Sequence, residues 1–205
     1  MASVSAVAFY LASEQGIANK VKLHKVLYYC QAWSLVWDGH ALFDARFEAW
    51  HNGPVCAEVW RAAQLVPGPL TLAERETIDA VVSLYGKFTG TELTQLSHSE
   101  VPWLTARQGL APDERSDVVI TTTSMRDFYS RYPNGQKSFD VATRNAIEEL
   151  ASLPLGTPPL ADDQVVDAEP FVQWLETGEG NPWARFRSSL RASSRLPRLA
   201  VAATE

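Results

Sequence analysis

The segment from Lys22 to Trp37 constrains the fold more than any other part of the sequence. Its apolar residues recur at the three- and four-residue spacing of a helix, and more apolar side chains fall on the remaining faces. Those at helical spacing are Leu23, Val26, Leu27, Cys30 and Trp33, and those on other faces are Tyr28, Tyr29, Leu35 and Val36. A helix that is apolar on nearly all sides needs other elements around it, so this segment predicts the central helix of a helical domain.

Further helices are predicted around this one. Ser3 or Ser5 can cap a first helix that ends near Gly16, and Thr71 and Glu74 are spaced as a capping box that opens another helix. Apolar spacing and turn residues predict the remaining helices over residues 54–65, 91–97, 102–108, 123–132 and 139–153.

Two segments have the pattern of short strands. Phe47 to Trp50 alternates in polarity, and Val118 to Thr121 is rich in β-branched residues, so the two are expected to pair. Asn52-Gly53-Pro54 is predicted to end the first strand, with Pro54 opening a helix at once because its ring already holds a helical φ. The predicted fold class is mainly α: a compact multi-helix domain with a small two-stranded β ribbon, a linker and a C-terminal helical extension.

Charge is unevenly distributed along the chain, whose net charge is −6. Residues 1–139 carry 14 acids and 12 bases, residues 140–180 carry nine acids and one base, and residues 181–205 carry one acid and five bases. The three parts therefore have net charges of −2, −8 and +4. An acidic chain lacks the basic footprint that phosphate contacts require, so nucleic-acid binding by the whole surface is not expected.

Composition also sets the expected domain boundaries. Pro154, Gly156, Pro158, Pro159 and three aspartates favour an extended linker over a packed element. We expect a main domain at 1–135, an additional helix packed on this core at 136–153, the linker at 154–168, and a C-terminal extension with a basic helix at 169–205.

The sequence predicts a cytoplasmic protein without membrane contact. No apolar run approaches the ~20 residues that span a bilayer, and Met1 to Val4 lacks the basic start of a secretory signal. Cys30 and Cys56 have no CxxC spacing, so we expect no disulfide, no zinc site and no other cofactor.

Four spaced blocks carry a resemblance to a known family. They are Lys22 to Trp33, then Leu42-Phe43-Asp44 with Glu48 to Val55, then Tyr85-Gly86, and last Leu96 to Trp103. Within them the motif residues are Lys22, Tyr28, Tyr29, Gln31, Trp33, Glu48, Trp50, Gly53, Pro54, Val55, His98, Glu100, Pro102 and Trp103. The chain resembles the Panacea domain of SocA-like and PanA-like antitoxins, a phage-associated protein family, over residues 4–132, including a closing pattern of Ile120, Met125, Phe128 and Tyr129.

The resemblance implies an antitoxin that neutralises a toxin commonly encoded beside it. In one branch of the family the antitoxin delivers its toxin to a cellular protease, so a protease is a second implied partner. The resemblance does not extend over the last third of the chain, and it identifies neither the toxin nor the stoichiometry.

Most residues of the first two blocks have a structural interpretation. A helical stripe of leucines and tyrosines is usually core, and packing explains Lys22, Lys25 and Gln31 least. Gly53-Pro54 is interpreted as a strand-to-helix turn. Glu48, on the strand before it, is expected to pair with a base or to cap the following helix.

His98-Ser99-Glu100 with Trp103 is the most enzyme-like cluster. An imidazole near a carboxylate can act as a general base, and His51 and Asp44 are candidates to join it in space. In the structural alternative Glu100 caps the helix that begins at Pro102, and His98 bonds a backbone group. No nucleophile motif, HExxH, phosphate loop or metal-ligand spacing accompanies the cluster, so no catalytic residue is assigned.

The C-terminal segment combines arginines with apolar and aromatic residues. Arginine and tryptophan are enriched at interface hot spots, so we predict partner binding by Trp183, Arg185, Phe186, Arg187, Arg191 and Arg195. In the alternative interpretation this basic end folds back on the acidic stretch 140–180.

Three functional hypotheses follow. The leading one is noncatalytic neutralisation of a cognate toxin by direct protein–protein binding. The second is a hydrolase or nuclease that uses His98, Glu100 and His51. The third is a DNA-binding autoregulator of its operon, for which Arg185 to Arg198 is the only candidate reader.

Overall fold

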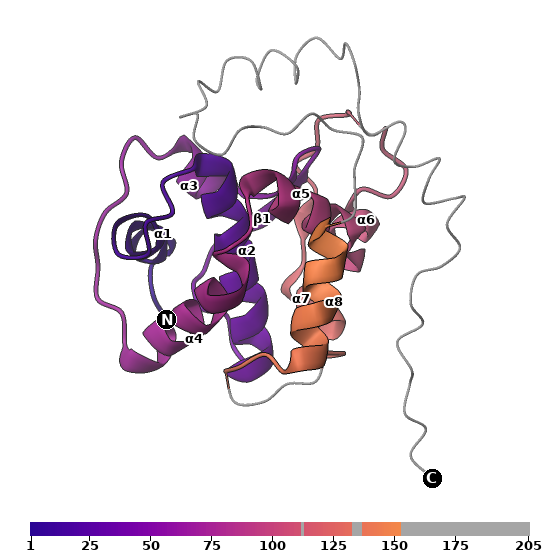
Figure 1. Ribbon diagram of the computed structural model, residues 1–205. Coiled ribbons are helices and arrows are strands. Elements are labelled where there is room, and N and C mark those ends of the chain that lie inside the picture. The colour runs from indigo at the N-terminus through magenta and orange to yellow at the C-terminus, as the bar shows by residue number, and fades with distance from the viewer. Residues whose placement is uncertain (112, 133–136, 153–205) are drawn as a thin grey trace.

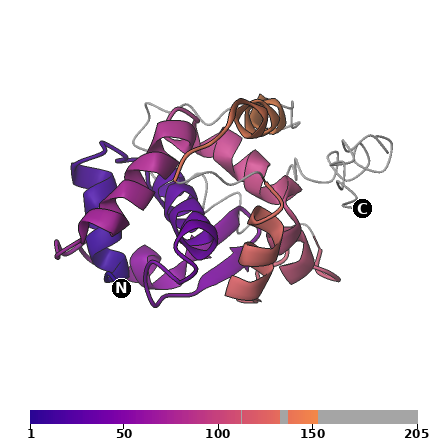
Figure 2. The ribbon, with the colours of Figure 1, turned by 90° about the horizontal axis from the view of Figure 1, so that it is seen from below.

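The apolar segment predicted to be central forms helix α2 (Lys20–Trp37), and the other elements surround it (Figures 1 and 2). The computed structural model describes residues 1–111, 113–132 and 137–152. Within these residues the other helices are α1 (Val4–Ser13), α3 (Ala57–Arg61), α4 (Leu72–Tyr85), α5 (Gly90–Ser99), α6 (Val101–Ala106), α7 (Thr122–Tyr129) and α8 (Val141–Ser152). The strands are β1 (Phe47–Trp50), β2 (Gly53–Cys56) and β3 (Val119–Ile120), so the fold is mainly α, as predicted.

Helix α2 packs against elements on every side. Asn19 caps its first turn by accepting a hydrogen bond from the Lys22 amide at 2.9 Å. From Leu23 to Leu35 every residue is buried, including the polar ones. In Figure 1 α1 and α4 lie on one side of α2 and α7 and α8 on the other, and α5 and β2 also contact it. The prediction that this apolar segment forms the central helix is therefore confirmed.

Local capping sequences determine where two further helices begin. The predicted capping box of α4 is present, because Thr71 accepts from the Glu74 amide while the Glu74 carboxylate accepts from the Thr71 amide. A second capping box, formed by Thr89 and Glu92, opens α5 at Gly90, one residue before its predicted start. The T-x-x-E spacing was present in the sequence, so this boundary was predictable.

The sheet has three strands, which corrects the predicted two-stranded ribbon. Its order is β2-β1-β3, and β1 is antiparallel to both neighbours. The predicted pairing of the first strand with the last is confirmed, since Phe47 lies opposite Ile120. The predicted strand-to-helix turn at Gly53-Pro54, with a helix over 54–65, is wrong. Pro54 lies in strand β2, opposite Ala49, and the next helix begins only at Ala57.

The physical reason for this correction is the turn at His51-Asn52. Gly53 has a φ of +94°, a conformation that residues with a side chain rarely adopt. With Gly53 in this conformation, the chain reverses direction over the two turn residues, and β2 pairs with β1. Proline lacks an amide donor, but β2 is an edge strand of this sheet, where a missing donor is tolerated.

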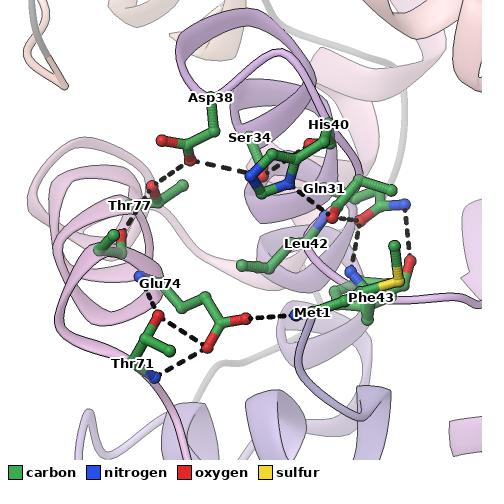
Figure 3. Close-up of polar contacts among 12 residues, drawn as sticks. Met1, Gln31, Ser34, Asp38, His40, Leu42, Phe43, Thr71, Glu74 and Thr77 are labelled. Carbon is green, nitrogen blue, oxygen red and sulfur yellow. Dashed lines mark hydrogen bonds and ion pairs between the residues drawn. The ribbon is translucent and has the colours of Figure 1, made fainter.

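Gln31 fixes the segment that connects α2 to β1 (Figure 3). Its side-chain oxygen accepts from the amides of Leu42 (3.0 Å) and Phe43 (3.3 Å), and its amide nitrogen donates to the Phe43 carbonyl (3.1 Å). In the same view the Met1 ammonium lies 3.3 Å from a Glu74 oxygen. Gln31 is one of the residues that packing explained least. Its side chain supplies the hydrogen bonds that a neighbouring strand would otherwise give to the backbone where the chain leaves the central helix.

Substituting Gln31 by leucine is expected to lower the free energy of unfolding by about 2 kcal/mol, because buried donors and an acceptor lose their partners without a change in volume. Urea unfolding measures the effect. Gln64→Leu, at an exposed position, is the matched control and is expected to change stability by less than about 0.5 kcal/mol. Equal effects of the two substitutions would contradict this role for Gln31.

Helix α8 lies within the predicted helix 139–153 and packs against α5. The linker at 154–168, the extension at 169–205 and its predicted contact residues Trp183, Arg185, Phe186, Arg187, Arg191 and Arg195 lie outside the described residues. The two cysteines, Cys30 and Cys56, are buried as free thiols.

Candidate functional site

Part of the family motif meets at the β1–β2 hairpin, and Lys25 from the first motif block holds the turn of this hairpin. The Lys25 ammonium donates to the carbonyls of Asn52 (2.5 Å) and Pro54 (3.2 Å). Its side chain is 1% exposed, and this burial lowers the pKa of the ammonium to about 7. The hairpin turn therefore closes over a lysine that comes from the second turn of α2.

Gly53 lies directly against this lysine. A Cβ at Gly53 would lie 2.8 Å from the Lys25 Cε and Nζ atoms and 2.8 Å from the Ser97 hydroxyl. Ser97 is fully buried on α5 and donates to the Thr94 carbonyl at 2.9 Å. Helices α2 and α5 thus meet the turn where it has no side chain.

The fourth motif block supports the hairpin from α5 and α6. The His98 ring stacks on Trp103 with centroids 3.8 Å apart, and the Trp103 indole donates to the Trp50 carbonyl at 2.9 Å. Burial lowers the pKa of His98 well below its usual value, and the charges of Lys25 and Arg107 lower it further. His98 is therefore a neutral ring in this core at physiological pH.

Arg107 ties the hairpin to the segment that leads into β3. Its guanidinium donates to the carbonyls of Ala49 (3.0 Å), Ala111 (2.7 Å) and Glu114 (2.8 Å). The residue is 3% exposed, and its guanidinium lies 5.4 Å from the Trp103 ring centroid. The sequence analysis missed Arg107, although its position four residues after Trp103 places the two on one helical face.

The Glu100 carboxylate binds two tyrosine hydroxyls and does not cap the helix that follows it. Its carboxylate accepts from the hydroxyls of Tyr129 (2.6 Å) and Tyr29 (3.3 Å). The predicted side-chain cap of α6 is therefore wrong, because Glu100 lies at the cap position without making that bond. Burial raises the pKa of Glu100 to about 8, which the two tyrosine hydrogen bonds oppose.

His51 and Asp44 do not complete a solvent-facing catalytic group. The His51 ring lies in the hairpin turn, with its Nε2 atom 2.8 Å from the Asn52 amide nitrogen, and burial lowers its pKa to about 4. Asp44 is exposed on the segment before β1. Of the proposed acid–base residues, His98 and Glu100 are at most 2% exposed, so in this conformation a substrate cannot reach them.

The remaining motif residues build the same core. Tyr29 stacks on Tyr85 at 4.0 Å, and the Trp33 indole donates to the Tyr85 hydroxyl at 3.1 Å. Glu48 accepts from the Trp50 indole at 2.7 Å, so its predicted pairing with a base or a helix cap is wrong. Tyr28, Val55 and Pro102 are buried, and Lys22 is half-buried.

The chemical role that these side chains can fill is to stabilise the conformation of the hairpin and the core. Across the described residues there is no group of three or more His, Cys, Asp or Glu side chains that could bind a metal ion. Likewise, none of the described helices is long and apolar enough to cross a membrane. The polar groups of the motif instead bond backbone carbonyls and tyrosine hydroxyls inside the core.

The fold and site define a class of protein: a mainly α domain in which buried motif residues clamp a β hairpin against a central helix. Residues 23–104 match the family model described as antitoxin SocA-like, Panacea domain. The match confirms the resemblance drawn from the motif blocks: residues 23–104 of this chain are similar to the Panacea domain of SocA-like antitoxins. No match was found among curated proteins or among solved structures.

Proposed function

We propose that this protein is an antitoxin that neutralises the product of an adjacent gene by binding it directly, without catalysing a reaction. The observation that carries the proposal is the match of residues 23–104 to the SocA-like antitoxin family, combined with the use of its motif residues inside the core. When polar motif residues serve to stabilise the fold, the domain acts as a scaffold, and partners bind to its surface.

The distribution of charge suggests which part of the chain contacts the toxin. The core of residues 1–139 is slightly acidic, whereas residues 181–205 are basic and contain the arginines and aromatics typical of interface hot spots. We assign toxin contact in part to Trp183, Arg185, Phe186, Arg187, Arg191 and Arg195. The Panacea core holds a surface in place, and the C-terminal region docks onto the toxin and blocks the toxin's active site or its membrane insertion.

Co-expression with the adjacent gene product tests the proposal. We expect that product alone to arrest growth and this protein to restore growth, and a stable complex should be recovered from the rescued cells. If the neighbour is harmless alone, or stays toxic in the presence of this protein, the proposal is overturned. The toxin's abundance separates two routes, since direct occlusion leaves it unchanged and delivery to a protease lowers it.

Glu100→Gln separates binding from catalysis in the same assay. Glutamine keeps an acceptor for the tyrosine hydroxyls but cannot carry a proton for acid–base chemistry, so we expect full rescue. Thermal unfolding of the purified variant is the control for folding. A variant that is folded and still binds the toxin but no longer rescues would favour the hydrolase or nuclease hypothesis.

A further inference from the structure

The outer face of the three-stranded sheet carries partly exposed side chains that lie next to one another. On the inner face Phe47 and Ala49 are buried in the core. Side chains alternate between the two faces of a strand, so Glu48 and Trp50 of β1 lie on the outer face. Val119 of β3 lies directly opposite Glu48 in the sheet register, which places it on the same face, and it is 39% exposed.

Trp60 continues this face at the β2 side, because α3 follows β2 and contacts it. Its ring meets that of Trp50 edge to face, with centroids 5.4 Å apart. The Lys20 ammonium lies over the Trp60 ring, 4.1 Å from the centroid. Both tryptophans are half-buried, so part of each ring stays accessible. We call Glu48, Trp50, Trp60 and Val119 the outer sheet face.

The Glu48 carboxylate lies between the tryptophans and the valine of this face. It accepts from the Trp50 indole at 2.7 Å. In residues 1–111, 113–132 and 137–152, no lysine, arginine or histidine forms an ion pair with it. A carboxylate that is half-buried without a cation is unfavourable, so this position favours a positive charge supplied by a partner.

We propose that the outer sheet face binds an arginine side chain of the toxin. Arginine matches both features of the face, because its planar guanidinium stacks on tryptophan rings and pairs with a carboxylate through two parallel hydrogen bonds. Lysine matches only one, since its ammonium is a point charge without a plane to stack. Apolar side chains beside the arginine would cover Val119. The inference rests on the proposed function, because the toxin supplies the arginine.

The face is formed before the partner arrives. Trp60 is held by Trp50, by Lys20 and by the buried His24 ring, whose centroid lies 5.3 Å away. Lys20 also donates to the Trp60 carbonyl at 3.1 Å, and the Trp103 indole donates to the Trp50 carbonyl. Binding therefore needs little ordering of these side chains. Tryptophan and arginine are also the side chains most typical of interface hot spots, which tend to pair across an interface.

A second copy of the chain is the competing occupant. A twofold dimer built on this face would bring the two Glu48 carboxylates toward each other, because such an interface uses the same surface on both subunits. Like charges placed together in an interface are unfavourable. The charge of the face therefore favours a basic partner over a second copy.

Titration calorimetry of the full chain with the purified product of the adjacent gene tests the proposal. Val119→Arg places a guanidinium opposite Glu48, where the two pair within the sheet and exclude the toxin's arginine. We expect the dissociation constant to rise about thirtyfold, as for the loss of a hot spot. Val118→Arg is the matched control, because Val118 is 44% exposed, extends the same β1–β3 ladder and lies on the opposite face. It adds the same charge and should change the constant by less than about threefold.

Glu48→Gln is the second variant. Glutamine keeps an acceptor for the Trp50 indole but carries no charge, so the fold is retained while the toxin's arginine loses its ion pair. We expect the dissociation constant to rise about tenfold or more. Thermal unfolding checks the fold of each variant, and Glu48→Gln decides if Val119→Arg does not fold.

The other outcomes overturn the proposal. Toxin binding of wild-type strength by folded Val119→Arg or Glu48→Gln would place the contact elsewhere and leave the proposed function intact. Equal losses in Val119→Arg and Val118→Arg would show that the face itself is not recognised. A wild-type dimer that Val119→Arg dissociates in sedimentation would assign the face to a second copy. If the wild-type chain binds no toxin, the proposed function fails as well.

Discussion

Gly53→Ala is expected to lower the free energy of unfolding by about 3 kcal/mol or more. The residue has a φ of +94°, which strains a residue with a side chain by about 1–2 kcal/mol. Its new methyl group would also lie 2.8 Å from the Lys25 ammonium and the Ser97 hydroxyl. Lys25 can move aside only by giving up its bonds to the hairpin carbonyls, which adds about 1–3 kcal/mol.

Gly109→Ala is the matched control, because its φ of +89° is nearly the same and nothing lies within 4 Å of the added methyl group. It should show the strain alone, about 1–2 kcal/mol. Urea unfolding of both variants gives the difference. If the two substitutions cost the same, the contact of Gly53 with Lys25 and Ser97 does not hold the hairpin.

The sequence predicted the helices well because local signals agreed with burial. The segment that became α2 is apolar on all faces, which only a central position satisfies, and Thr71 with Glu74 marks the start of α4 by its own hydrogen bonds. The pairing of the first and last strands was also predictable, since they were the only two segments with clear strand character.

The hairpin was not predictable from local pattern. Proline after glycine is typical of a helix start, and β2 has only four residues, two of them Gly53 and Pro54. What stabilises β2 as a strand is Lys25, 27 residues away from the Asn52 carbonyl that it binds. A long-range contact thus overrides the local preference.

The same limit applies to the candidate site. His98 and Glu100 lie two residues apart and resemble an acid–base pair in the sequence, but one stacks on Trp103 and the other accepts from tyrosines. Residue type and spacing left acid–base chemistry open as an alternative, whereas the structure shows both side chains buried in the core. Exposed apolar side chains such as Leu104 and Val119 lie outside the motif blocks.

Acidification from pH 7 to pH 5 is expected to lower the free energy of unfolding by about 3 kcal/mol. Burial lowers the pKa of His24 to about 3 and of His51 to about 4, and that of His98 well below its usual value. Below pH 6.5 the unfolded chain therefore binds protons at three histidines that stay neutral in the folded chain. By pH 5 each of the three lowers the free energy of unfolding by about 2 kcal/mol. Glu100 opposes this, since its pKa of about 8 lets the folded chain hold a proton that the unfolded chain releases above pH 4.5.

Two variants should move this pH dependence in opposite directions. His98→Phe keeps a ring against Trp103 but cannot titrate, so the loss between pH 7 and pH 5 should shrink by about 2 kcal/mol. Glu100→Gln removes the opposing proton, so the loss should grow by about 2 kcal/mol. Urea unfolding at both pH values measures each difference within one variant, which cancels any constant cost of the substitution. Identical pH dependence in the wild type and both variants would mean that neither group titrates differently on folding.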